Sequence, residues 1–351
     1  MLCLVAASAP AAAQPRPPIR LVLEHTIDDR VGLSLGRIER IALGPDGSVA
    51  AVDGANGVVY RFTPAGKLRD SLGRKGQGPG EFQVAAGLGV GPAGEIALAD
   101  LRNRRLTFWE PDGRLRGSTQ LGAMPVDLLW SEGDPIVGVV VFAVTPVAPL
   151  IRFAPIRLDK AEPGPELAAF PDPATADYPT AVSCGTCRHA LSAAGRLVVA
   201  APDTFYRVSE LDAAGKPLRS WRRGDIGAGL RTPEEFATLK SRLQAGPGGG
   251  RPPPGAEARF RAPGDDALRF RNRFQGLGVD ATGRLLALVS NAGSTRPVID
   301  VFGPDGRFQG TIVLQAQFQA MVVRGSREAA LGETADGTPA ILVYRIEELP
   351  R

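Results

Sequence analysis

The sequence is short of the residues that most often carry chemistry. Its 351 residues include two histidines and three cysteines, and aromatic residues make up 6%. Two histidines exclude a zinc site built from three imidazoles. The Gly-x-Ser-x-Gly motif of serine hydrolases is missing, and no Ser/His/Asp catalytic triad can be recognised in the sequence. Nothing in the sequence therefore identifies a catalytic residue.

Long apolar runs and strong charge are missing as well. No segment approaches the roughly 20 apolar residues that cross a bilayer as a helix. The formal net charge of +4 is small for a chain of 351 residues, and it falls short of the charge that marks a nucleic-acid-binding surface. We therefore expect no transmembrane segment and no nucleic-acid partner.

The first residues have the features of an export signal. Leu2–Ala9 is apolar, and Ala11–Ala13 supplies a small-x-small cleavage pattern before Gln14. A basic segment before the apolar run is absent, so a disordered leader is the alternative. Cys3 lacks the residues that precede a lipid-anchored cysteine. We expect residues 1–13 to be a truncated signal peptide and the rest to act in the periplasm or outside the cell.

Removal of that signal would leave a single Cys-x-x-Cys pair, Cys184 and Cys187. In an exported protein such a pair is expected to form a short-loop disulfide. Haem attachment needs histidine directly after the second cysteine, and Arg188 stands there instead. A redox-active pair, a metal site and free thiols remain alternatives, although the first needs a helix N-terminus and the second more ligands than His189.

What the sequence does have is a repeat of 47 residues. Its copies align at every turn: Pro45-Asp46-Gly47 with Pro92-Ala93-Gly94, Asp53 with Asp100, Asn56 with Asn103, and Pro64-Ala65-Gly66 with Pro111-Asp112-Gly113. A fixed period of 20 to 50 residues is typical of solenoids, propellers and arrays. Each block holds four short apolar runs separated by glycine turns, which predicts four strands in a meander. Such units, arranged radially, are the blades of a β-propeller.

The weaker copies are recognised by their turns. They are Glu132-Gly133-Asp134, Ala194-Gly195, Ala214-Gly215, Thr282-Gly283, Asp305-Gly306, Gly325-Ser326 and Asp336-Gly337. The last block is one strand short, and Ile19–Leu23 can supply that strand and close the ring without an exposed sheet edge. We therefore predict an all-β, six-bladed propeller as one domain over residues 14–351, monomeric, with the third block the least regular.

A family resemblance rests on three runs. GRKGQGPGEF at 73–82, AVDGANGVVYRF at 51–62 and ALADLRNRRLTFWEPDG at 97–113 resemble NHL-repeat propellers, and most of all the exported six-bladed propeller proteins of bacteria. The resemblance is strong over residues 38–120 and recognisable at 187–222 and 273–312. It implies a six-bladed ring with glycine-rich links between blades, and it implies no particular chemistry.

The links between blades and the Asp-x-x-Asn turns should share one face, which also receives an insertion at 231–273. A Thr-Pro-Glu-Glu start at Thr232 predicts a short helix over 236–243, followed by a Gly/Pro connector. Basic residues gather on this face: Arg74, Lys75, Arg102, Arg104, Arg105, Arg222, Arg223, Arg259, Arg261, Arg269 and Arg271. We expect this face to bind a protein, peptide or carbohydrate ligand without a cofactor.

A second hypothesis is a divalent-metal-dependent lactonase or hydrolase of the gluconolactonase type. Its oxygen ligands, suited to calcium, would be Asp53, Asn56, Asp100, Asn103, Asp203 and Asn291. Recurrence at equivalent turns argues for a structural role, because Asp and Asn side chains cap tight turns of this kind. Both hypotheses remain open at the level of the sequence.

Overall fold

The structure of the chain is a computed structural model. It describes residues 15–31, 35, 37–121, 125–130, 136–144, 149–157, 168–171, 189–192, 194–200, 206–212, 214–225, 233, 234, 237, 274–289, 297–316, 318–334 and 337–350. In the strands that cover 136–144, 149–157 and 168–171 it describes the backbone alone.

The first repeat block folds as an antiparallel meander, here called blade 1. Its strands are β2 (Ile38–Leu43), β3 (Val49–Asp53), β4 (Val58–Phe62) and β5 (Leu68–Leu72). The turn between β2 and β3 is closed by a hydrogen bond from Gly44 N to Ser48 O of 2.7 Å. Gly47 adopts a φ of 88° in this turn, a conformation that glycine reaches without steric cost. The predicted turn chemistry therefore sets the register of the meander.

Five further four-stranded antiparallel sheets accompany blade 1. Blade 2 consists of β8 (Ala85–Val90), β9 (Ile96–Asp100), β10 (Arg105–Trp109) and β11 (Leu115–Gln120), and the third sheet consists of β12 (Pro125–Trp130), β13 (Ile136–Val144), β14 (Pro149–Arg157) and β15 (Ala168–Pro171). Blade 4 consists of β16 (His189–Leu191), β17 (Leu197–Ala200), β18 (Arg207–Leu211) and β19 (Pro217–Arg222), and blade 5 consists of β20 (Phe274–Val279), β21 (Leu285–Val289), β22 (Val298–Phe302) and β23 (Phe308–Val313). The closing blade consists of β24 (Phe318–Arg324), β25 (Arg327–Glu333), β26 (Pro339–Glu348) and β1 (Ile19–Ile27). A 3₁₀ turn, η1 (Asp29–Val31), follows β1.

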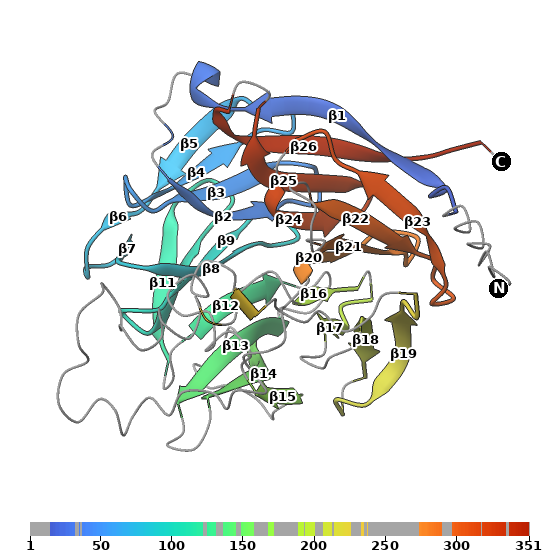
Figure 1. Cartoon of the computed structure of the whole chain (residues 1–351). Helices are drawn as coiled ribbons and strands as arrows, with labels where there is room; N and C mark the ends of the chain where they lie inside the picture. The colour runs from blue at the N-terminus through green and yellow to red at the C-terminus, as the bar shows by residue number, and fades with distance from the viewer. Residues whose placement is uncertain are drawn as a thin grey trace, which may run out of the picture.

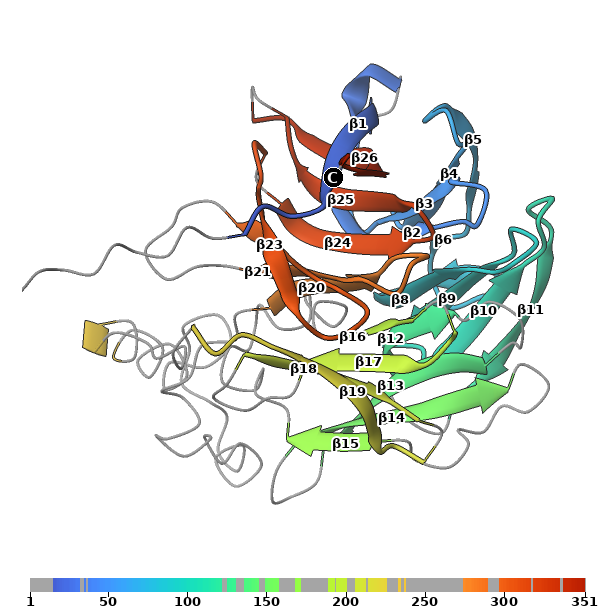
Figure 2. The same cartoon turned by 90° about the vertical axis from the view of Figure 1, so that its right-hand side faces the viewer.

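The sheets are arranged radially, which confirms the predicted all-β propeller. The first strands of successive sheets contact one another around the centre, from β2 through β8, β12, β16, β20 and β24 back to β2, and the outer strands lie at the rim (Figures 1 and 2). Five of the sheets are described with their side chains as complete blades. The expected count of six rests, for the third sheet, on backbone pairing alone.

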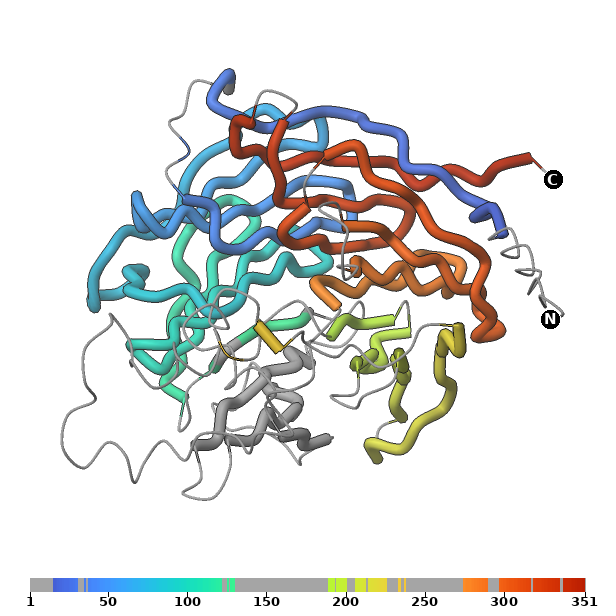
Figure 3. Tube along the Cα trace, viewed as in Figure 1, coloured from blue at the N-terminus to red at the C-terminus, as the bar shows by residue number. Residues whose placement is uncertain are grey.

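The N-terminal strand closes the ring as the sequence predicts. β1 pairs antiparallel with β26, from Ile19 opposite Glu348 to Ile27 opposite Ile341. The two ends of the chain therefore run side by side (Figure 3). Arg20 Nε donates to Glu347 Oε2 at 2.9 Å across this seam. The pairing leaves the outer edge of β26 covered, so that the closing blade has its fourth strand.

The core is divided into layers between neighbouring blades. One layer joins blades 1 and 2 through Val52, Leu72, Leu88 and Trp109, and Phe82 from the link lies within it at 2% exposure. Phe82, the last residue of the glycine-rich link, therefore packs between the two blades. Each blade thus buries both of its faces, which explains why β3, β9 and β21 are buried at every position.

Two predicted features fall on residues outside the described ranges. Within the insertion at 231–273, only Pro233, Glu234 and Ala237 are described, as helical. The rest of the predicted helix over 236–243 lies outside the described residues, as do Cys184 and Cys187 with their predicted disulfide. Among the described residues, no helix is long and apolar enough to cross a membrane.

One buried carboxyl has no evident reason in the sequence pattern. Glu328 on β25 is fully buried, opposite Val323 on β24 and Tyr344 on β26. Neither of its carboxyl oxygens has a hydrogen-bond partner among the described residues. Burial raises the pKa of Glu328 to about 8, because the charged form is poorly solvated there. Burial, and then the charge of Glu328, raise the pKa of Tyr344 to about 12.

Glu328→Gln is expected to remove a pH dependence from the stability of the ring. Between the ordinary pKa of 4.5 and about 8, the folded chain holds a proton on Glu328 that the unfolded chain has lost. The free energy of unfolding should therefore fall by about 1.4 kcal/mol per pH unit across this window as pH rises. Urea unfolding at pH 5 to 9 measures it. Glu333→Gln, on the same strand but partly exposed, is the control. A pH profile that Glu328→Gln leaves unchanged would contradict the assignment.

Candidate ligand-binding face

The link between blades 1 and 2 is a short, internally bonded loop. β6 (Arg74–Lys75) and β7 (Glu81–Phe82) pair in parallel. Gly76 N donates to Phe82 O at 3.0 Å, and Gly78 N donates to Glu81 Oε2 at 2.7 Å. The glycines permit this tight path, since a Cβ on Gly76 would meet the Glu81 side chain. The loop is therefore shaped by its own hydrogen bonds.

The Asp-x-x-Asn turn of blade 2 is organised around a buried carboxylate. Asp100 is fully buried and accepts hydrogen bonds from the backbone N–H groups of Gln83, Val84, Arg102 and Asn103, at 3.0 to 3.2 Å. The Asn103 side chain adds a fifth, from Nδ2 to Asp100 Oδ2 at 2.6 Å. This one carboxylate joins the turn to the residues that precede β8, the inner strand of the same blade.

The link is fastened to that same turn. Asn103 Nδ2 donates to Gly76 O at 3.0 Å, while the Arg105 guanidinium donates to Gln77 O at 2.9 Å, to Gly78 O at 2.8 Å and also to Glu81 O. A Cβ on Gly57, in the turn of blade 1, would lie 2.8 Å from Lys75 Cβ. The link and both turns therefore lie together on one face, as predicted.

Three cations stand exposed on this assembly. They are Lys75, Arg102 and Arg104, here called the link patch. Within the described part of the chain, none of the three side chains has a hydrogen-bonded or ion-paired partner. Arg104 has a φ of 51°, the left-handed conformation, at the position where blade 1 has Gly57. A side chain in that conformation is uncommon and costs energy.

The fourth predicted cation of the link, Arg74, is paired. Its Nε lies 2.6 Å from Glu81 Oε1, and the Arg74 side chain is 80% exposed. A hydrogen bond from Gly78 N, and then Arg74, lower the pKa of Glu81. Because Glu81 is also held by the loop backbone, Arg74 is tied to the link and is less available to a ligand than the link patch.

Arg222 and Arg223 are adjacent in the sequence but have different surroundings in the structure. Arg222 is exposed at the end of β19. Arg223 is 8% exposed, donates from Nη1 to Asp300 Oδ2 at 2.9 Å and stacks 4.0 Å above the Phe308 ring. Although burial opposes it, the contacts with Asp225 and Asp300 raise the pKa of Arg223. Arg223 therefore joins blades 4 and 5, and its geometry is that of a structural residue. The predicted Arg259, Arg261, Arg269 and Arg271 lie outside the described residues.

The two described carboxylates of the predicted metal site, Asp53 and Asp100, accept hydrogen bonds from the protein itself. Asp53 repeats the pattern of Asp100, accepting from Arg37 N, Ala55 N and Asn56 N at 2.9 to 3.2 Å and from the Asn56 side chain at 2.8 Å. Asp203 and Asn291 lie outside the described residues. Across the described ranges, no group of three His, Cys, Asp or Glu side chains is placed to hold a metal ion.

One buried polar pair was not predicted. His189 Nε2 contacts Asp127 Oδ2 between the inner strands β16 and β12, and both side chains are almost fully buried. Asp127 also accepts from Leu128 N at 2.7 Å. The signal available in the sequence was a single acid within the apolar run Pro125–Trp130. Its partner on another sheet could not be read from it.

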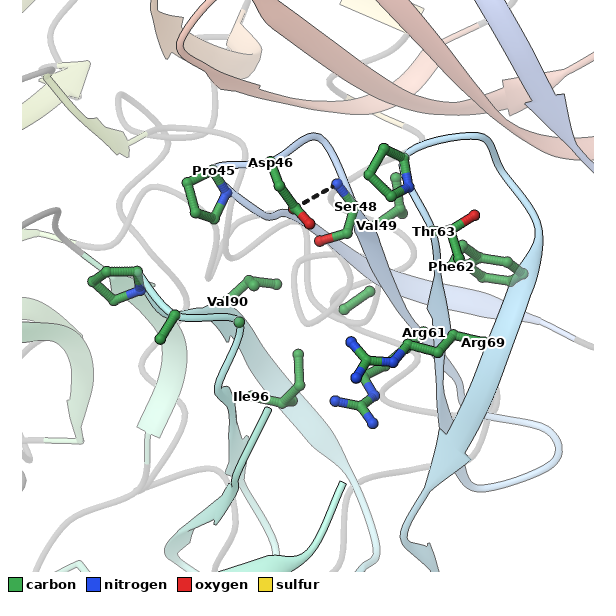
Figure 4. A pocket seen from close by; sticks show the side chains of 15 residues that line it. Pro45, Asp46, Ser48, Val49, Arg61, Phe62, Thr63, Arg69, Val90 and Ile96 are labelled. Atoms are coloured by element: carbon green, nitrogen blue, oxygen red, sulfur yellow. Dashed lines mark hydrogen bonds between the residues drawn. The ribbon is translucent and has the colours of Figure 1, made fainter. Parts of the chain in front are cut away.

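A cavity on the opposite face was not predicted either. It lies between blades 1 and 2, where the Pro-x-Gly turns meet (Figure 4). A signal did exist, because several of its polar residues are positions where the second copy of the repeat departs from the first.

Comparison with known proteins supports the fold. No protein-family model matches the chain, and no curated protein matches it. A Bacteroides fragilis protein assigned as exported has a similar structure, with a TM-score of 0.56 and 11% identity over 95% of each chain. A gluconolactonase of Xanthomonas campestris has a TM-score of 0.50 and 14% identity, over 98% of this chain and 100% of its own. At such low identity the likeness establishes a β-propeller, and membership of the NHL family stays a prediction.

Asp100→Ala is expected to cost about 3 kcal/mol of unfolding free energy, because it leaves buried N–H groups without acceptors. Urea denaturation measures the loss. Asp112→Ala is the matched control in the same blade, since Asp112 is exposed and accepts from one N–H, that of Arg114. Its expected cost is below about 1 kcal/mol. The loss in Asp100→Ala should be the same with and without chelator. Equal losses in the two variants would contradict a structural carboxylate.

Proposed function

We propose that this protein is an exported, non-catalytic β-propeller that binds an anionic ligand or protein partner through the link patch. The proposal rests on one observation: three exposed cations are attached to a backbone that is held in place by hydrogen bonds between the link and the turn. Lys75 sits on the link, and Arg102 and Arg104 sit on the turn to which the link is hydrogen-bonded. A rigid scaffold with charged loops is a common basis for binding.

Rigidity matters here because exposed ion pairs are individually weak. One such pair contributes about 0.2 to 1 kcal/mol, and much of the gain is lost in ordering long side chains. A fixed backbone lowers that loss, since the attachment points of all three cations are already in place. Arginine also offers a planar fork that fits carboxylates and phosphates. An acidic peptide or an anionic sugar therefore matches the patch best.

The remaining parts of the proposal have separate support. Export is supported by the apolar start and its cleavage pattern at residues 1–13. A non-catalytic role is supported by the lack of a recognisable nucleophile, and by the engagement of Asp53 and Asp100 with backbone N–H groups. The insertion at 231–273 would add its arginines to the same face and so extend the binding surface.

Neutralising the link patch tests the proposal. Lys75→Gln/Arg102→Gln/Arg104→Gln should weaken binding of an oligoglutamate peptide or of polygalacturonate by about 3- to 150-fold, the sum of three exposed pairs. Fluorescence titration at two salt concentrations measures the affinity, which should fall with salt in the unmodified protein.

The matched control removes the same charge from the opposite face. Arg114, Arg116 and Arg307 have side chains 71%, 55% and 87% exposed, on or beside the turns that follow third strands. Their triple Gln variant should bind as the unmodified protein does. If both triple variants lose affinity equally, net charge rather than the link patch governs binding, and the placement is wrong.

The lactonase hypothesis is tested on the same material. We expect the purified protein to carry no stoichiometric divalent metal, because the two described carboxylates of its ligand set accept hydrogen bonds from N–H groups. Elemental analysis, and a lactone panel assayed with and without chelator, measure this. About one metal per chain together with chelator-sensitive lactone hydrolysis would contradict the non-catalytic hypothesis. The metal ligands would then have to be sought at Asp203, at Asn291 or among other residues.

A further inference from the structure

A cavity of about 420 Å³ opens between blades 1 and 2 on the face opposite the link patch. Its volume lies within the range that small-molecule sites occupy. One wall comes from the turns and outer strands of blade 1, the other from the first turn of blade 2 (Figure 4). Val49, Val90 and Ile96 form the apolar floor, and Pro45, Pro64 and Pro92 stand around the opening.

Guanidinium groups occupy one end of the cavity. Arg61 is buried, donates from Nε to Asp70 Oδ1 at 2.6 Å and from Nη1 to Pro111 O at 2.8 Å. Arg69 donates to the same carbonyl from Nη2 at 2.9 Å, so the two guanidinium groups lie side by side. The Arg69 side chain is 51% exposed and its Nε lies 4.0 Å from Asp70 Oδ2, while its Nη1 has no hydrogen-bond acceptor within the described residues. Asp70 balances one of the two positive charges, and one remains.

A carboxylate occupies the other end. Asp46 Oδ1 accepts from Ser48 N at 2.9 Å, and the side chain faces the opening (Figure 4). Although partial burial works to raise it, the hydrogen bonds from Ser48 and the charge of Arg69 lower the pKa of Asp46. The cavity is therefore apolar along its floor, negative at one end and positive at the other.

The repeat shows that these polar groups are not needed to build a blade. The second copy keeps the equivalents of Pro45 and Pro64 and the equivalent of Arg69, which is Arg116, but it replaces four polar residues of the cavity. Asp46, Ser48, Arg61 and Thr63 of blade 1 correspond to Ala93, Glu95, Phe108 and Glu110 of blade 2. Blade 2 forms the same four strands with those replacements. These four polar residues of the lining are thus not repeated at the equivalent positions of blade 2.

We propose that this cavity is a second binding site, which takes a short apolar peptide with free termini. The peptide carboxylate would meet the unused edge of Arg69, its ammonium group would meet Asp46, and its side chains would cover Val90 and Ile96. A zwitterion with an apolar body is the one ligand class that uses both charged ends and the floor between them. The site is independent of the link patch.

Calorimetric titration of the full chain with unblocked Ala/Val peptides of two to four residues tests the proposal. The best length should bind, and N-acetylation or C-amidation of that peptide should each weaken binding about 10-fold, as expected for the loss of one charge-assisted contact. Arg69→Gln should weaken the free peptide and abolish the effect of C-amidation. Asp46→Asn, which keeps the acceptor for Ser48 N, should abolish the effect of N-acetylation.

Arg116→Gln is the control, since it is the repeat equivalent of Arg69 and does not line the cavity. It should bind peptide normally, and unchanged thermal unfolding of all three variants would show that each is folded. Three results would overturn the proposal: no peptide binding at millimolar concentration, equal binding of blocked and free peptides, or binding that Arg69→Gln leaves unchanged. Hexanoate binding as tightly as the peptide would also overturn it, because the Asp46 end would then be unused.

Discussion

Everything described here depends on the pairing of the two ends of the chain. A ring of sheets has no exposed edge at its seam only if the last blade is completed, and β1 does this by pairing with β26 along most of its length. The closure holds the inner strands in their positions around the centre, and so it also sets the gaps between blades. The link patch and the cavity both lie at the gap between blades 1 and 2. Weaker pairing between β1 and β26 would therefore change the geometry of the link patch and the cavity.

In blades 1 and 2, a buried carboxylate joins the Asp-x-x-Asn turn to the start of the inner strand. Asp53 and Asp100 each gather N–H groups from their own turn and from the start of a neighbouring strand. Such N–H groups, if buried and unpaired, would cost more than an ordinary hydrogen bond gains. The same residues that suggest calcium ligands in the sequence thus have their oxygens occupied. These hydrogen bonds hold the backbone of the turns in place. In blade 2, the side chains of Arg102 and Arg104 lie between the bonded residues Asp100, Asn103 and Arg105 and face solvent.

The sequence predicted the strands, the faces and the closure because each depends on local or periodic signals. Turn glycines and alternating apolar runs are local, and the offset of 47 residues makes two copies confirm each other. Side-chain roles that depend on a neighbouring blade could not be predicted in this way. Arg222 and Arg223 are adjacent and chemically identical, yet only Arg223 reaches Asp300 and Phe308 on blade 5. Glu328 is likewise an ordinary acid in the sequence, and its burial follows from blades that pack on both sides of β25.

The repeat is informative in two opposite ways. Where its copies agree, as at Asp53 and Asp100, the shared residue is explained by the blade that both copies build. Where they differ without changing the strands, the fold does not require the difference, and another cause has to be sought. Gly57 and Arg104 differ in this sense, and the larger residue occupies a left-handed backbone position at a cost. Asp46 and Arg61 differ in the same sense on the other face. Departures of this kind between blades 1 and 2 are therefore the basis on which we propose a binding site on each face of the gap between them.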